Sequence, residues 1–173
     1  MASSFNLNRS STGDNLMQVT SQLLSLLKAN VSLTTLKDTL LSHPDYPSML
    51  SISESLERWK VKSVGLKVSP DKLESLPAPF IAYFSGQRFI TVTKVSENTI
   101  TYLDKNNREQ TYSKEVFLNQ WEEVVLLAES GKESGEAEYK RIRRKETWHT
   151  LRIPLAFFGL LCLGLVQIEN LIV

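Results

Sequence analysis

The sequence almost lacks cysteine: Cys162 is the only one among 173 residues. No disulfide can form within the chain, and no cysteine cluster exists for zinc or an iron–sulfur centre, so we expect no metal and no cofactor. An excess of one charge is also absent, because 20 basic side chains face 19 acidic ones. Without a broad positive field, nucleic acid is a poor candidate partner.

A secretory signal is missing as well. Residues 1–12 are polar and rich in serine and asparagine, with no apolar stretch behind a basic start. The lone cysteine fits a reducing compartment, so we expect the ordered part of the chain to lie in the cytoplasm. Residues 1–13 are predicted to be a flexible N-terminus, and residues 14–128 the folded domain.

Apolar residues at helical spacing predict three helices at the start of this domain. The first covers residues 14–28, where leucines and a valine form one stripe. The second begins after Ser32, the expected N-cap, and ends before Pro44, because proline cannot continue a helix. The third follows the turn of residues 43–47 and ends before Val61.

The pattern then changes to the alternation that is typical of strands. Val64, Leu66 and Val68 alternate with glycine and lysine. Further strands are predicted at residues 79–84, 89–95, 99–103 and 124–127, with a short helix capped by Ser113 before the last. Short turns between them indicate an antiparallel meander. Helices first and strands later predict an α+β domain in which the helices pack on the sheet.

The C-terminal part has a different composition. Residues 129–150 are almost wholly polar and are predicted to be a charged linker or exposed helix, whereas residues 151–173 are apolar. A spanning helix needs ~20 mainly apolar residues, so this segment is marginal in length, and a buried core helix is the alternative to the predicted transmembrane segment. Basic residues on its N-terminal flank favour the membrane and a cytoplasmic location for that flank. The residues predicted to contact lipid headgroups, rather than solvent alone, are Arg141, Arg143, Arg144, Lys145 and Arg152.

Several stretches, in their order along the chain, resemble a known family. They are residues 31–36 (VSLTTL), 76–81 (LPAPFI), 88–92 (RFITV), 103–104 (LD), and Phe117 with Trp121. Together they resemble the bacteriocin-processing cysteine peptidases, which are papain-like domains at the N-terminus of peptide-exporting ABC transporters and cut leader peptides after a double glycine. The resemblance covers residues 6–128 and implies a papain-like fold and a bacterial inner-membrane protein with its globular domain in the cytoplasm.

The resemblance also implies where a catalytic site would lie. It places the nucleophilic cysteine on Asn15, the histidine on Arg88 and the aspartate on Asp104, so only the aspartate is kept. An asparagine cannot supply a thiolate, and an arginine stays protonated at neutral pH and cannot serve as the base. We therefore expect no catalytic residues. If the strands pair as in the family, Arg88 either forms an ion pair with Asp104 or does not, and both alternatives stay open.

The proline-rich turn contains the next candidates, His43, Asp45 and Tyr46. One histidine and one aspartate are too few for a metal site, so a role in stabilising the turn is the preferred interpretation for His43. The alternative interpretation is that this turn, with Tyr46 between two prolines, recognises a binding partner.

These observations lead to one expected function and three alternatives. The expected function is an inactive peptidase-like domain that binds a peptide or docks on a membrane partner. The turn of residues 43–48 also resembles the version of this domain fused ahead of vitamin K epoxide reductase-like membrane domains, which carry out thiol–disulfide exchange. The first alternative is that the chain is the N-terminal part of such an enzyme. The second is that it is the N-terminal part of an ABC exporter of peptides. In both, the active domains lie beyond Val173. An active peptidase with an unusual nucleophile is the last alternative.

Overall fold

The computed structural model describes residues 2–139, 141 and 144. Its first helix, α1 (Ala2–Leu26), begins well before residue 14, where the sequence analysis placed the start of the helix and a flexible segment before it. Residues 2–13 contain no proline, and Gly13 is the only glycine among them. Since one glycine costs a helix only about 1 kcal/mol, it does not stop the helix from extending toward the N-terminus.

The other two predicted helices are present. Helix α2 (Leu33–Leu41) begins after Ser32, whose side chain accepts a hydrogen bond from the backbone N–H of Thr35. Helix α3 (Met49–Arg58) begins with a capping box, in which Ser48 and Ser51 each bond the other's backbone N–H. These caps satisfy backbone donors that a helix leaves unpaired at its first turn, so the start of each helix is fixed by its local sequence.

Six antiparallel strands form one sheet in the order β1-β6-β2-β3-β4-β5. The strands are β1 (Val61–Lys67), β2 (Phe80–Phe84), β3 (Arg88–Val95), β4 (Thr99–Leu103), β5 (Glu109–Ser113) and β6 (Trp121–Ser130). The short helices η1 (Pro70–Ser75) and α4 (Lys114–Leu118) lie between strands in the sequence. The sequence analysis missed β5, which is a polar edge strand, and the α+β class is confirmed.

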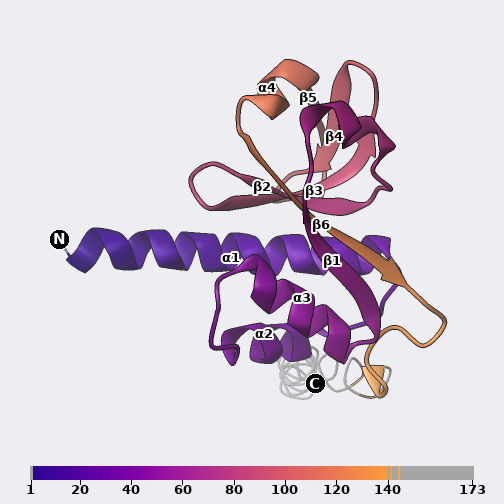
Figure 1. Ribbon diagram of the computed structural model, residues 1–173. Helices are drawn as coiled ribbons and strands as arrows, with labels where there is room; N and C mark the ends of the chain where they lie inside the picture. The colour runs from indigo at the N-terminus through magenta and orange to yellow at the C-terminus, as the bar shows by residue number, and fades with distance from the viewer. Residues whose placement is uncertain (1, 140, 142–143, 145–173) are drawn as a thin grey trace, which may run out of the picture. The chain divides into compact units, whose positions relative to one another are not determined.

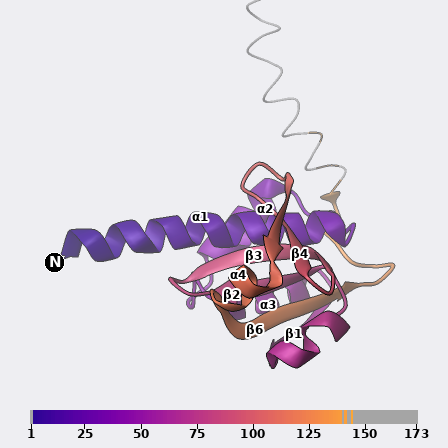
Figure 2. The ribbon, with the colours of Figure 1, turned by 90° about the horizontal axis from the view of Figure 1, so that it is seen from above.

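The sheet separates two apolar clusters. On one face, here called the helical face, buried residues of α1, α2 and α3 pack against strand residues such as Ile81, Phe89 and Leu126. On the opposite face, Phe80, Phe84 and Val125 of the strands pack against Leu73 of η1 and Phe117 of α4. Figure 1 shows α2 and α3 at one end of the domain that contains the sheet and α4 at the other end. Figure 2 shows α1 running alongside β3.

The compact unit that carries this sheet extends to Glu136, past the predicted boundary at residue 128. Residues 137 onward belong to a separate unit, in which Arg141 pairs with Glu138 and the described side chains of Arg141 and Arg144 are exposed. The other predicted lipid-facing residues, Arg143, Lys145 and Arg152, and the predicted transmembrane segment of residues 151–173, lie outside the described residues. Within the described part of the chain, no helix is long and apolar enough to cross a bilayer.

Candidate functional site

Asn15 joins helix α1 to the beginning of strand β3. Its side-chain Nδ2 donates a hydrogen bond of 3.0 Å to the carbonyl oxygen of Phe89, and its Oδ1 accepts one of 2.7 Å from the backbone N–H of the same residue. Strand β4 has no residue opposite Phe89, because the last pair in that direction is Thr91 with Leu103. The amide of Asn15 therefore occupies the position that the next residue of β4 would take in the ladder.

Arg88 precedes Phe89, and its side chain lies on the opposite face. It is paired across the strands with Phe84, a fully buried member of the cluster on that face, and its guanidinium carbon lies 5.3 Å from the centre of the Phe84 ring. Its Nη2 donates a hydrogen bond of 2.7 Å to Oε1 of Gln120. Successive side chains of a strand point to opposite faces of the sheet. The buried Phe89 therefore points to the helical face and the exposed Arg88 to the opposite face.

Asp104 shapes the turn between β4 and β5. Its Oδ1 accepts hydrogen bonds from the backbone N–H groups of Asn106, at 2.7 Å, and Arg108, at 2.9 Å. The bond from Arg108 is the main cause that lowers the pKa of the Asp104 carboxyl below its ordinary value. None of the described ion pairs joins Asp104 to Arg88. Of the two alternatives left open by the sequence, the Arg88–Asp104 ion pair is therefore wrong. The backbone of the turn holds the carboxylate, while Arg88 contacts Gln120.

Gln22 is a residue of this region that the sequence analysis missed. Its Nε2 donates to the carbonyl oxygen of Asp104 at 2.8 Å and to Oδ1 of Asn107 at 3.0 Å. Its Oε1 is buried and has no hydrogen-bond partner among the described residues. A glutamine on an amphipathic helix looks like a surface residue in the sequence, and its partners lie more than 80 residues further along the chain, so no local pattern indicates this contact.

A cleft of about 400 Å³ opens beside the contact between α1 and the start of β3. It is bounded by α1 one turn before Asn15, by the residues on either side of Arg88, by the start of α3 and by other strand side chains. The lining residues are Thr12, Pro47, Ser48, Met49, Tyr83, Gln87, Phe89 and Val124. None of these is a cysteine, histidine or carboxylate. The cleft therefore offers apolar surface and a few neutral polar groups, which suit binding of an uncharged ligand segment and supply no nucleophilic sulfur or histidine base.

The turn before α3 forms one wall of the cleft. His43 is buried, its Nε2 lies 2.8 Å from Oε2 of Glu54, and its Nδ1 accepts a hydrogen bond of 3.1 Å from the backbone N–H of Asp45. Since Nδ1 is the acceptor, Nε2 carries the proton that is donated to Glu54. This geometry favours the turn-stabilising interpretation of His43.

Tyr46 of the same turn contacts α1. A Cβ atom added at Gly13 would lie 2.6 Å from the Tyr46 hydroxyl, so glycine at this position permits the close approach. Burial, and next the negative charge of Asp14, raise the pKa of Tyr46. Tyr46 thus lies where the turn meets α1, and the residues that line the cleft include neither Asp45 nor Tyr46.

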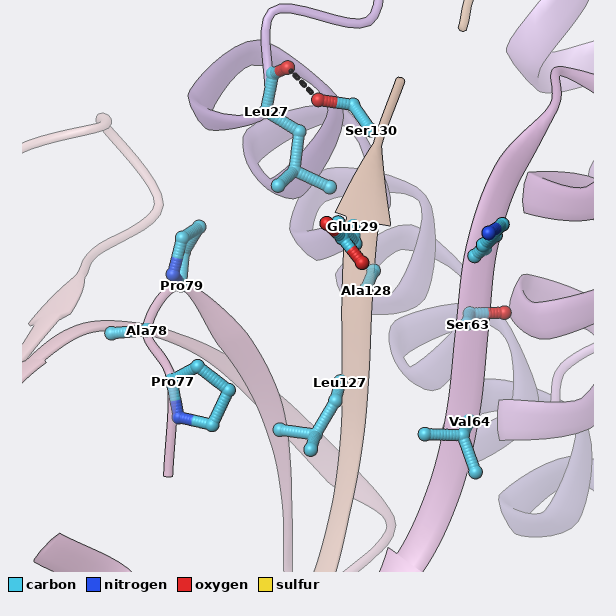
Figure 3. A pocket seen from close by; sticks show the side chains of 11 residues that line it. Leu27, Ser63, Val64, Pro77, Ala78, Pro79, Leu127, Ala128, Glu129 and Ser130 are labelled. Atoms are coloured by element: carbon cyan, nitrogen blue, oxygen red, sulfur yellow. Dashed lines mark hydrogen bonds between the residues drawn. The ribbon is translucent and has the colours of Figure 1, made fainter. Parts of the chain in front are cut away.

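A second, larger pocket of about 650 Å³ lies over the end of β6. Figure 3 shows Val64 of β1 and Leu127 of β6 on one side of it and the segment of residues 77–79 on the other, and it marks the hydrogen bond from the Ser130 hydroxyl to the Leu27 carbonyl oxygen. The residues that line this pocket do not include Asn15, Arg88 or Asp104. The described residues include no cluster of three or more histidine, cysteine or carboxylate side chains that could hold a metal ion.

Comparisons with known proteins agree with this architecture. The model of the Peptidase C39 family matches residues 9–133. Among solved structures, a double glycine motif protease from an AMS/PCAT transporter, in complex with the leader peptide, has a TM-score of 0.61 at 14% identity, covering 68% of this chain and 84% of that one. The peptidase domain of Streptococcus ComA, a bi-functional ABC transporter involved in a quorum sensing pathway, has a TM-score of 0.59 at 17% identity, covering 69% and 93%.

A third similar structure is the N-terminal peptidase C39 like domain of a toxin secretion ATP-binding protein from Vibrio parahaemolyticus. Its TM-score is 0.59 at 14% identity, and the alignment covers 68% of this chain and 97% of that domain. The comparison with curated protein sequences gave no match. At these identities the structural likeness shows a shared fold, and the papain-like fold that the resemblance implied is confirmed.

Proposed function

Because the chain belongs to the Peptidase C39 family, we propose that it is a member without peptidase activity, whose cleft binds a peptide or a protein partner. The observation that carries this proposal is the double hydrogen bond between the Asn15 amide and the backbone of Phe89. The resemblance assigns the nucleophile to the position of Asn15, and here both polar atoms of that side chain are used to hold α1 against β3.

The chemistry at the other two positions supports the same proposal. A cysteine peptidase needs a base that exchanges a proton near neutral pH, and a guanidinium remains protonated there. The Arg88 side chain also contacts Phe84 and Gln120, away from the helical face on which Asn15 lies. Asp104 keeps a carboxylate, but its oxygen accepts backbone hydrogen bonds within its own turn. No pair of these groups forms a nucleophile with its base.

The cleft beside Asn15 supports peptide binding. Its lining includes the largely apolar Met49, Tyr83 and Phe89 and the polar Thr12, Ser48 and Gln87. Such a mixture suits an extended chain, whose backbone needs a few hydrogen bonds and whose side chains need apolar contacts. The AMS/PCAT protease of similar fold was solved with its leader peptide, which makes a leader-like peptide the first ligand to test.

The proposal includes a membrane tether. Residues 151–173 form the apolar segment, and the basic residues that precede it, among them Arg141 and Arg144, keep the folded domain on the cytoplasmic side.

A second candidate is that the chain is the N-terminal part of a larger membrane protein. The similarity to the peptidase domain of Streptococcus ComA, a bi-functional ABC transporter, favours a peptide exporter. A vitamin K epoxide reductase-like fusion would instead have a downstream Cys-x-x-Cys pair. The reading frame after Val173 distinguishes the two.

The test of peptide binding without cleavage uses the full chain and a fluorescent double-glycine leader peptide. Anisotropy should show saturable binding, and mass spectrometry after prolonged incubation should show the peptide intact. Met49→Arg places a charge at the cleft wall and should weaken binding by about tenfold, equivalent to ~1.4 kcal/mol. Val116→Arg, at an exposed site on α4, is the matched control and should bind as the unchanged chain does.

Two results would contradict the proposal. Turnover of the peptide that one substitution in the chain abolishes would show a working peptidase. Absence of saturable binding for every leader peptide tried, or equal affinity of the Met49→Arg and Val116→Arg variants, would remove the cleft as the binding site.

A further inference from the structure

The chain leaves the folded unit at a fixed point, the N-terminus of helix α2. The side-chain oxygens of Glu136 accept hydrogen bonds from the backbone N–H of Ser32, at 3.0 Å, and from the hydroxyl of Thr35, at 2.6 Å. The backbone N–H of Glu136 donates to the carbonyl oxygen of Asn30 at 2.8 Å. A carboxylate at the N-terminus of a helix is favoured by the unpaired N–H groups and the helix dipole.

The residues just before Glu136 strengthen this attachment, and we call residues 134–136 the latch. Gly135 donates its backbone N–H to the Trp59 carbonyl oxygen at 2.8 Å, and the Ser134 hydroxyl donates to the Lys60 carbonyl oxygen at 2.6 Å. Gly135 has a φ of +124°, and a Cβ there would lie 2.9 Å from the Asn30 oxygen. Only glycine fits both requirements, so the latch depends on this residue.

Helix α2 presents an apolar stripe to solvent next to the latch. Leu33 is 68% exposed and Leu41 is 51% exposed, and Leu33 is the most exposed large apolar residue among those whose side chains are described. Residues 33, 37 and 41 are four apart and so share one face of the helix. The residue between the two leucines is the exposed Lys37, and the exposed Lys28 precedes the helix. Exposed leucines with lysines among them are typical of a helix that lies on a membrane surface.

We propose that this face of α2, formed by Leu33, Lys37 and Leu41, contacts the cytoplasmic surface of a bilayer that contains anionic lipid. The inference rests on the membrane tether in the proposed function. Residues 137–150 connect the latch to the apolar segment, and fourteen residues span about 21 Å as a helix or at most about 50 Å when extended. With the exit fixed at the first turn of α2, Leu33 is among the exposed apolar groups nearest to the start of that connection.

The exposed apolar groups outside α2 are all less exposed than Leu33. Val64 and Leu66 lie on β1, Val116 on α4, Leu50 in the first turn of α3 and Leu26 at the end of α1. The latch bonds to the first turn of α2 and to the end of α3 instead. Figure 1 shows the orange segment that follows β6 turning back to the end of the unit that holds α2 and α3, while α4 lies at the far end. A bilayer held close to the exit therefore meets α2 before α4.

The test places an environment-sensitive fluorophore on the full chain in nanodiscs of phosphatidylcholine and phosphatidylglycerol. In a Cys162→Ser background, Leu33→Cys and Leu41→Cys carry the label in two samples, and Val64→Cys, which is 48% exposed in the native protein, carries it in the control. We expect blue-shifted emission and quenching by lipid-borne quenchers at positions 33 and 41, and neither at position 64. Both signals should weaken in nanodiscs of phosphatidylcholine alone.

A second variant tests the role of the latch. Glu136→Ala removes the acceptors for Ser32 and Thr35, so the signal at position 33 should fall toward that of the control, with the circular dichroism spectrum unchanged. If the chain enters nanodiscs but the labels at 33 and 41 behave like the label at 64, the α2 contact is wrong and the tether stands. If the chain does not enter nanodiscs at all, the tether and this inference both fail.

Discussion

Asn15 and Arg88 lie near the same end of strand β3, yet they are held in different ways. Asn15, on the helical face, bonds only to backbone atoms, the N–H and the carbonyl oxygen of Phe89. Arg88, on the opposite face, contacts only side chains, the amide of Gln120 and the ring of Phe84. The Asn15 side chain satisfies backbone groups of β3 that would otherwise lack hydrogen-bond partners, whereas the Arg88 side chain is exposed and satisfies no backbone group of the described residues. The two positions should therefore respond differently to substitution.

The largest effect should come from the core beneath Arg88, not from Arg88 itself. Phe84 is fully buried and contacts Phe117 edge-on, with ring centres 5.1 Å apart. Phe84→Ala removes this ring and leaves a cavity, so it should lower the free energy of unfolding by about 3–5 kcal/mol. Urea unfolding followed by tryptophan fluorescence measures the change. A loss no larger than that caused by Arg88→Ala would show that the opposite face is loosely packed.

Asn15→Ala should have the next largest effect. Two hydrogen bonds of about 1 kcal/mol each are lost, and the Phe89 N–H is left without a partner, so a loss of about 2–3 kcal/mol is expected. Gln18→Ala is the control on the same helix, because Gln18 makes a single, longer bond of 3.3 Å to the Asp104 carbonyl oxygen. Equal losses for the two variants would remove the distinction between the Asn15 joint and an ordinary contact of α1.

The tyrosines of the opposite face allow a smaller, pH-dependent test. Tyr102 and Tyr112 are stacked with ring centres 4.5 Å apart, and burial, followed by the hydrogen bond with Tyr112, raises the pKa of Tyr102 to about 12. The unfolded chain would lose this proton near the ordinary value of about 10. The stabilising effect of this shift is therefore complete below pH 10 and is lost as the pH rises toward 12.

Tyr112→Phe removes the hydrogen bond and keeps the stacked ring. Absorbance at 295 nm should then show Tyr102 titrating at a lower pH than in the unchanged chain. The variant should be less stable than the unchanged chain at pH 7, and the difference between the two proteins should shrink as the pH rises from 10 toward 12. Identical titration curves for the two proteins would show that the Tyr112 hydroxyl does not act on Tyr102.

Much of this fold follows from local sequence signals. The cap at Ser32, the proline after α2 and the alternation in β1 each depend on residues a few positions apart, and the predicted elements are found there. Strand β5 was missed because the edge strand has little to bury: Glu109, Gln110 and Thr111 are all exposed. The start of α1 was missed because residues 2–13 lack an apolar stripe, and the helix continues there without one.

The candidate site was harder to predict than the fold. The contact between Asn15 and Phe89 joins residues 74 positions apart, and no pattern in either segment indicates it. The resemblance to a peptidase family brought Asn15 and the start of β3 to the same place, but it did not give the directions of the side chains. Strand register decides those: Arg88 is paired with Phe84, and β4 ends opposite Thr91.

The smallest expected effect is the coupling between Arg88 and Asp104, and it tests this register directly. Leu103 lies opposite Thr91, so the Asp104 turn leaves the sheet before it reaches Arg88. The Asp104 carboxylate is satisfied by the N–H groups of its own turn, and Arg88 is satisfied by Gln120. Substitutions at sites without a shared partner have additive effects. In urea unfolding, the shift in midpoint of the Arg88→Ala, Asp104→Ala double variant should therefore equal the sum of the two single shifts. A double shift clearly smaller than that sum would mean that the two charges meet in solution, and that the division between the two faces at the start of β3 is less strict than the hydrogen bonds indicate.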